Sequence, residues 1–155
     1  MPTISGGIVT GPAEILTQEI TFIETSGAGV YTGSVTVPAE SWLLDIKIWN
    51  AAYWTNAGTA AMIVGDGVDP NGWYDAIDLK ATDIVPNEVI DFNNPGGQEG
   101  AYLVTATGQR STMYSTLARV VTGEITTSST GGTAGRTRML VIYTTTSNAG
   151  AAVKV

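Results

Sequence analysis

Hydrophobic and polar residues alternate along short stretches of the chain, and glycine, proline and asparagine separate these stretches. Alternation over about 5–10 residues between turn formers is typical of β-strands. No window of helical length keeps an apolar repeat of three and four residues, so we expect almost no α-helix. The candidate strands are residues 18–24, 30–37, 42–50, 60–64, 73–79, 88–92, 101–105, 117–127 and 138–145.

The stretch from Trp42 to Asn50 shows the clearest alternation. Its even-numbered apolar residues, Trp42 to Ile48, fall on one face of a regular strand, and its odd-numbered residues, Leu43 to Trp49, fall on the other. Side chains two apart in a strand share a face. We therefore expect Trp42 to pack in the core and Trp49 to lie on the opposite face.

About eight to nine short strands at regular spacing predict an all-β protein. Long early connections and Gly-rich corners favour an antiparallel β-sandwich of jelly-roll type over an immunoglobulin-like one. Residues 117–127 and 138–145 flank the loop Ser128–Gly135, which predicts a long hairpin. We expect residues 17–155 to form a single sandwich domain. Residues 1–16 hold isolated apolar side chains among glycine and proline, which predicts an extended N-terminal arm.

The composition of the 155-residue chain excludes several types of catalytic and metal site and argues against two classes of partner. The chain contains neither histidine nor cysteine, which excludes Ser-His-Asp and Cys-His catalysis and zinc sites made by those side chains. The formal net charge is −7, so a phosphate backbone would be repelled and we expect no nucleic-acid partner. No apolar run reaches the roughly 18 residues of a membrane span, so we expect no membrane partner.

An acidic, glycine-rich stretch between residues 65 and 79 is a candidate calcium site. Carboxylate and amide oxygens are the ligands that Ca²⁺ prefers, but the spacing does not follow the EF-hand rule. Asp-Gly, Asp-Pro and Asn-Gly are also common turn formers, so a structural turn is the competing interpretation. We therefore expect no cofactor and no metal, with one weak set of calcium candidates, Asp66, Asp69, Asn71, Asp75 and Asp78.

Two pairs of carboxylates invite comparison with the acid and base of a glycosidase. They are Asp75 with Asp78 and Glu88 with Asp91. Each pair is three residues apart, so on a regular strand its members point to opposite faces. A surface or turn position is the simpler interpretation, and we do not expect an enzyme.

Aromatic residues are concentrated between Trp42 and Tyr74. Exposed aromatics serve as anchors in protein interfaces, and in some sandwich domains they stack on sugar rings. Trp54 and Tyr74 fall beside predicted turns, so they are candidate contact residues. Packing within the domain is the alternative for both.

Several motifs resemble a group of small structural proteins of tailed bacteriophages. They are Gly65-Asp66-Gly67-Val68-Asp69-Pro70-Asn71-Gly72, Ile77-Asp78-Leu79-Lys80-Ala81-Thr82-Asp83, Gly100-Ala101-Tyr102-Leu103 and Arg138-Met139-Leu140-Val141-Ile142-Tyr143. Proteins of this group are encoded among head genes, and several are thought to be capsid decoration, or cement, proteins. The resemblance implies a β-rich knob, often trimeric, that grips the outer shell, and it supplies no catalytic residue.

The sequence thus predicts a capsid decoration protein that stabilises an icosahedral phage head. Its expected partners are the major capsid protein and further copies of itself in a homotrimer. Its expected location is the capsid exterior, after synthesis in the host cytoplasm. The expected contact residues are Ile4, Ile8, Ile15, Leu16, Trp54 and Tyr74. The alternative is a glycan-binding module of a phage tail or fibre, with Trp49, Trp54, Trp73 and Tyr74 as stacking platforms.

Overall fold

A computed structural model describes residues 14–80 and 82–145 of the chain. In these two ranges the chain forms nine β-strands and no helix, so no helix there could cross a membrane. The strands are β1 (Ile15–Ile23), β2 (Val30–Val37), β3 (Ser41–Ala52), β4 (Ala60–Gly65), β5 (Tyr74–Asp78), β6 (Val89–Ile90), β7 (Tyr114–Ser115), β8 (Arg119–Thr127) and β9 (Arg136–Thr145). The expected all-β class is confirmed.

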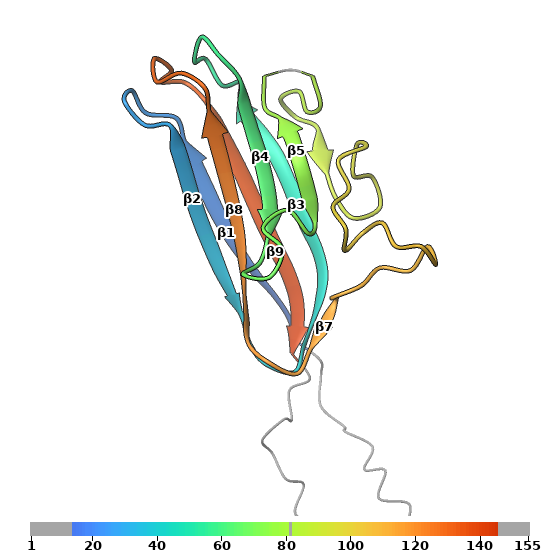
Figure 1. Ribbon diagram of the computed structural model, residues 1–155. Helices are drawn as coiled ribbons and strands as arrows, with labels where there is room; N and C mark the ends of the chain where they lie inside the picture. The colour runs from blue at the N-terminus through green and yellow to red at the C-terminus, as the bar shows by residue number, and fades with distance from the viewer. Residues whose placement is uncertain (1–13, 81, 146–155) are drawn as a thin grey trace, which may run out of the picture.

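The strands form two antiparallel sheets that pack face to face (Figure 1). One sheet has the order β1-β9-β3-β6, with β7 also paired to β3, and is called sheet A here. The other, sheet B, has the order β2-β8-β4-β5. β1 pairs with β9, β2 with β8, β3 with β6 and β4 with β5, so the pairs are nested from the chain ends inward. This nesting is the jelly-roll topology, so the expected sandwich type is also confirmed.

The core lies between the sheets and is built from alternate residues of the longer strands, together with side chains of the loops that join them. Branched aliphatic and aromatic side chains dominate it, as expected for strands buried on one face. Its largest fully buried side chains are Trp54, Trp73, Tyr74, Ile46, Ile48, Met62, Ile77, Leu79, Ile84, Ile125, Met139 and Val37.

One buried carboxylate, that of Glu24, ties together the loops at the upper end of the sandwich in Figure 1. It accepts hydrogen bonds from the N–H groups of Thr55 and Asn56 in the β3–β4 loop, both at 2.9 Å. It also accepts them from Ala134 and Gly135 in the β8–β9 loop, at 3.2 and 2.9 Å. Glu24 follows the last residue of β1, so its side chain joins three chain segments that are distant in sequence.

Several details of the strand predictions are wrong, and β7 was not predicted. Residues 101–105 do not form a strand: residues 101–103 form turns, and Val104 donates its N–H to the carbonyl oxygen of Gly100 at 3.1 Å. β8 and β9 do not form a hairpin, because β8 lies in sheet B and β9 in sheet A, and the loop between them crosses from one sheet to the other. β1 begins at Ile15, so Ile15 and Leu16 belong to sheet A and not to the arm. Ile4 and Ile8 lie outside the described residues.

Candidate functional site

An exposed group of apolar side chains lies on the outer face of sheet A, at the end where β1 begins. The backbone register places Trp42 of β3 opposite both Thr144 of β9 and Tyr114 of β7, and Thr144 also lies opposite Ile15 of β1. Residues directly opposite each other in antiparallel strands share a face. Ile15, Trp42 and Tyr114 therefore form one row across the sheet.

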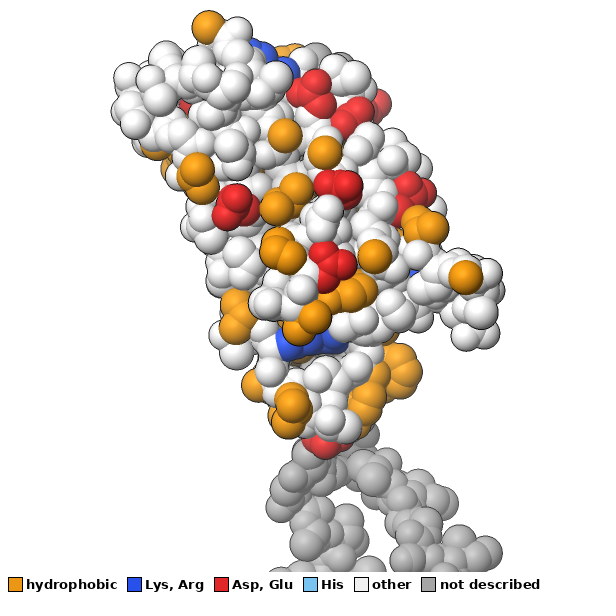
Figure 2. Space-filling view, in the orientation of Figure 1, with side chains coloured by type: hydrophobic (Ala, Val, Ile, Leu, Met, Phe, Trp, Pro, Cys, Tyr) orange, Lys and Arg blue, Asp and Glu red, His pale blue; other side chains and the backbone are white. Residues whose placement is uncertain are grey.

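The row is open to solvent and contains a pair of aromatic rings in contact. Trp42 is 48% exposed, Tyr114 39% and Ile15 67%. The rings of Trp42 and Tyr114 are tilted against each other with their centroids 5.2 Å apart. Leu44, which is 42% exposed, follows Trp42 along β3. We call Ile15, Trp42, Leu44 and Tyr114 the apolar patch. Figures 1 and 2 are seen from the side of sheet B, so the outer face of sheet A is turned away, and Figure 2 shows only hydrophobic side chains at the lower right edge of the molecule.

Hydrogen bonds to neighbouring segments fix the backbone that carries the patch. Leu43 donates its N–H to the carbonyl oxygen of Met113 at 2.7 Å, which docks the segment before β7 onto β3. The guanidinium of Arg119 donates to the same carbonyl at 2.6 Å. The Tyr114 hydroxyl donates to the carboxylate of Glu40, and this bond raises the pKa of Tyr114. These hydrogen bonds fix the positions of Trp42 and Tyr114 relative to each other.

The expected core position of Trp42 is wrong, and a β-bulge is the reason. The register between β3 and β9 shifts by one residue between Leu43 and Asp45, so Leu44 is an extra residue in β3. An inserted residue reverses which side chains face inward. Leu43 is buried before the bulge, and Ile46 and Ile48 are buried after it. The bulge thus leaves Trp42 and Leu44 on the outer face.

The predicted surface positions of Trp54 and Tyr74 are also wrong. Trp54 is 2% exposed and donates from Nε1 to the Thr137 hydroxyl at 2.8 Å. Tyr74 is fully buried and donates its hydroxyl to the carbonyl oxygen of Ile46 at 2.8 Å. Its burial, with Asp45 and Asp91 nearby, raises the pKa of Tyr74. Neither side chain is therefore exposed at the surface of the described chain.

Burial equally contradicts the predicted sugar-stacking platform. Trp73, like Trp54 and Tyr74, is buried, and it packs edge-on against Tyr102 with ring centroids 5.2 Å apart. Trp49 is half-buried on the outer face of sheet A. A flat aromatic surface for a sugar ring is therefore not formed by these four residues.

The acidic stretch after β4 forms a turn that uses its own carboxylates. Asp66 Oδ1 accepts hydrogen bonds from the N–H groups of Val68 and Asp69, both at 2.9 Å, and from the Tyr102 hydroxyl at 3.1 Å. Burial and this carboxylate raise the pKa of Tyr102 to about 12. A Cβ on Gly65 would lie 2.0 Å from the carbonyl oxygen of Asp69, so only glycine fits there.

The other calcium candidates lie apart from that carboxylate or serve the backbone. Asp69 Oδ1 accepts the N–H of Asn71 at 3.4 Å, and Asp78 Oδ1 accepts that of Lys80 at 2.8 Å. Asp75 is exposed on β5. In the described part of the chain, no three acidic side chains are grouped so that they could hold a metal ion. These contacts are those of a structural turn.

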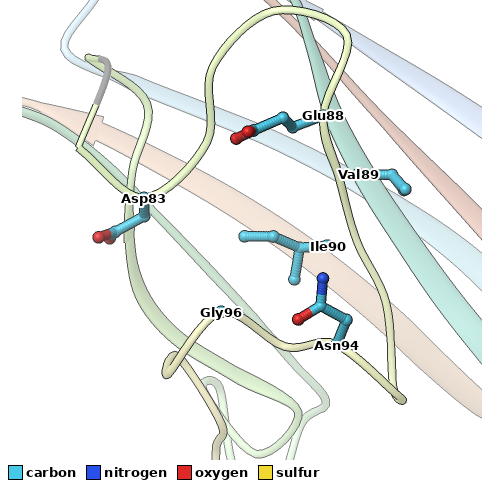
Figure 3. A pocket seen from close by; sticks show the side chains of 6 residues that line it. All are labelled: Asp83, Glu88, Val89, Ile90, Asn94 and Gly96. Carbon is cyan, nitrogen blue, oxygen red and sulfur yellow. The ribbon is translucent and has the colours of Figure 1, made fainter.

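Glu88 and Asp91, the second pair of carboxylates considered as an acid and base, bind different partners. Glu88 lines a hollow of about 300 Å³ with Asp83, Val89, Ile90, Asn94 and Gly96 (Figure 3). Its Oε2 accepts the N–H of Val85 at 3.2 Å, whereas Asp91 Oδ2 binds Lys47 Nζ at 3.1 Å. In Figure 3 the Asp83 carboxylate points away from Ile90, and it accepts the N–H of Asp78 at 2.7 Å. The carboxylates of this region therefore fix loops.

Comparison with known proteins finds similarity in fold. No protein-family model matches the chain, and no curated protein matches it. A chain of the structure titled "Acidic stable capsid structure of Helicobacter pylori bacteriophage KHP30" is 12% identical, with a TM-score of 0.47 over 82% of this chain and 93% of that one. A chain of the "Cyanophage Pam1 capsid asymmetric unit" is 16% identical, with a TM-score of 0.48 over 86% and 84%. Both solved structures are phage capsids.

Proposed function

We propose that this chain is a structural protein of a tailed-bacteriophage head that binds the outer surface of the icosahedral shell as a decoration, or cement, protein. In this proposal its partner is the major capsid protein, and it acts through a contact surface without catalysis. The sequence motifs that resemble phage head proteins suggest the class. The single structural observation that carries the proposal is the exposed apolar patch.

The composition of the patch suits a contact with another protein. Tryptophan and tyrosine are enriched at the centres of protein interfaces, where each buries a large area at a small cost in side-chain entropy. Trp42 and Tyr114 form such a pair, and Ile15 and Leu44 surround it with aliphatic surface. In water these side chains stay partly hydrated, so covering them with a partner is favourable.

The chain direction suggests how the contact continues. Ile15, part of the patch, is the first residue of β1, and residues 1–14 precede it in the sequence. We propose that Ile4 and Ile8 in that arm extend the contact with the shell or with a neighbouring copy. Leu16, the next residue of β1, is partly buried and packs against the core.

Such binding would stabilise a head by mass action. A protein that binds only the assembled shell lowers the free energy of that shell by RT ln(1 + [L]/Kd), where [L] is the concentration of the free protein. The stabilisation therefore grows as more free protein is present. We propose a homotrimer at a three-fold position, as the resembling proteins suggest. Three linked patches would then bind far more durably than one.

Binding to heads that lack this protein tests the proposal. The wild-type chain is expected to co-sediment with such heads saturably. Each aromatic anchor is worth about 2 kcal/mol, so a variant with both Trp42→Ser and Tyr114→Ser should lose about 4 kcal/mol and bind roughly 1,000-fold more weakly. Both side chains are exposed, so the fold should survive, which a melting curve checks.

The matched control is Ile23→Ser. Ile23 is 49% exposed and lies at the opposite end of β1 from Ile15. This control should bind like wild type. Equal binding by the double variant would exclude the patch as the contact, and a wild-type chain that never binds heads would contradict the proposed function.

A further inference from the structure

Among the described strands, β2 forms one edge of sheet B. Sheet B has the order β2-β8-β4-β5, so β2 pairs with β8 on one side, and no described strand pairs with its other side (Figure 1). β1 lies nearby, but it belongs to sheet A and pairs with β9. The backbone of β2 therefore presents hydrogen-bonding groups that no strand in residues 14–80 and 82–145 uses.

Two hydrogen bonds identify which residues of β2 face this edge. The carbonyl oxygen of Gly29 accepts the N–H of Thr127, so Gly29 points toward β8. The carbonyl oxygen of Thr36 accepts the side-chain amide of Gln18 at 3.3 Å, so Thr36 points away from β8. Backbone groups alternate in direction along a strand. Val30, Thr32 and Ser34, like Thr36, therefore direct N–H and C=O outward.

The upper part of this edge lacks the usual protection. Natural proteins blunt exposed edges with charged side chains, prolines, bulges or very short strands. β2 runs for eight residues, VYTGSVTV, with no charge, no proline and no shift in its register to β8. The side chain of Gln18 binds the outward carbonyl oxygen of Thr36 and so covers only the C-terminal end of β2. Three alternate residues, from Val30 to Ser34, remain open.

We propose that β2 pairs antiparallel with β2 of a second copy of this chain, centred on Thr32. A two-fold contact requires a surface that is complementary to itself. In this register Thr32 meets its own counterpart and Val30 meets Ser34, so no like charges lie opposite each other. The three residue pairs exchange about six backbone hydrogen bonds, and the two four-stranded sheets become one continuous sheet.

The edge contact is separate from the proposed contact with the shell. β2 lies in sheet B, whereas the apolar patch lies on the outer face of sheet A. The inference therefore does not depend on the proposed function. In a decorated head, such pairing would join two copies from neighbouring trimers.

Hydrogen exchange of the full-length chain tests the pairing without any substitution. The N–H groups of Thr32 and Ser34 should exchange quickly in dilute solution. They should slow by at least about tenfold at high concentration, which corresponds to nine-tenths of the copies being paired. Protection that is independent of concentration would mean that the chain covers its own edge, and fast exchange at all concentrations would mean that nothing does. Either result would overturn the inference.

The mass of Ser34→Pro in solution is a second test. Proline removes the outward N–H of Ser34 but none of the bonds to β8, and edge strands tolerate proline at such positions. The control, Ser34→Ala, loses the same hydroxyl contact to Thr122 and keeps the N–H. Wild type and control should have twice the mass of Ser34→Pro. Equal masses for wild type, Ser34→Ala and Ser34→Pro would contradict the pairing, and so would a wild type that is a monomer or an isolated trimer. If Ser34→Pro does not fold, the hydrogen-exchange experiment on the unsubstituted chain tests the pairing instead.

Discussion

Replacing Glu24 by alanine is expected to lower the free energy of unfolding by about 3–5 kcal/mol, because several buried N–H groups lose their acceptor at about 1–3 kcal/mol each. Glu24 is 2% exposed and accepts hydrogen bonds from both the β3–β4 and the β8–β9 loops. Urea unfolding should show a lower midpoint at an unchanged slope.

The matched control for this variant is Glu19→Ala. Glu19 also lies on β1, and its carboxylate is 3.2 Å from Arg138, but both side chains are well exposed. A pair of this kind contributes about 0–1 kcal/mol. If the two variants lowered stability equally, Glu24 would not be the centre of the loop network.

The Glu24 effect should also depend on pH. Burial raises the pKa of Glu24, but the backbone N–H groups of Thr55, Gly135 and Asn56 and the Thr55 hydroxyl lower it by more, so it lies below 4.5. A lowered folded-state pKa stabilises the protein above the ordinary value of 4.5, and this contribution is lost as the pH falls through the folded value. The difference between wild type and Glu24→Ala should therefore be constant near neutral pH and narrow in acid.

Replacing Trp54 by alanine is the second change with a large expected effect. The indole is buried, packs edge-on against Tyr31 with ring centroids 4.8 Å apart, and lies beneath Gly135. Its Nε1 begins a buried chain of hydrogen bonds through Thr137 to Asn50. Truncating a buried tryptophan costs about 3–5 kcal/mol.

Two variants of Trp54, Trp54→Ala and Trp54→Phe, distinguish a role in packing the core from a role in binding to heads. Trp54→Phe keeps much of the buried area but loses the hydrogen bond to Thr137, so it should lie between wild type and Trp54→Ala in thermal and urea unfolding. Neither variant should weaken binding to heads while it stays folded. A Trp54→Ala protein of normal stability that fails to bind would restore Trp54 as a contact residue.

The fold class was predictable because it depends on many local signals. Short alternating stretches separated by turn residues recur along the chain, so an error in one strand did not change the class. The jelly-roll arrangement was suggested by connection lengths, whereas β8 and β9 were wrongly expected to pair. Their loop crosses between the sheets, and its residues Ala134 and Gly135 bind Glu24, a contact between residues far apart in the chain that local sequence does not show.

The candidate site was less predictable because it depends on one inserted residue. The bulge at Leu44 reverses the pattern, so an alternation that looked regular placed Trp42 on the wrong face. Trp54 and Tyr74 lie near strand ends, and the sequence could not show that loops cover them. The contact of Trp42 with Tyr114 joins residues far apart in the chain, and only the paired backbone of β3 and β7 reveals it.

A density map of the intact virion tests the central claim most directly. The account predicts a jelly-roll density outside the shell floor, with the face that carries Trp42 and Tyr114 against the major capsid protein and residues 1–14 leading from Ile15 into that contact. Heads without such density, or the same sandwich found only in the tail, would contradict it.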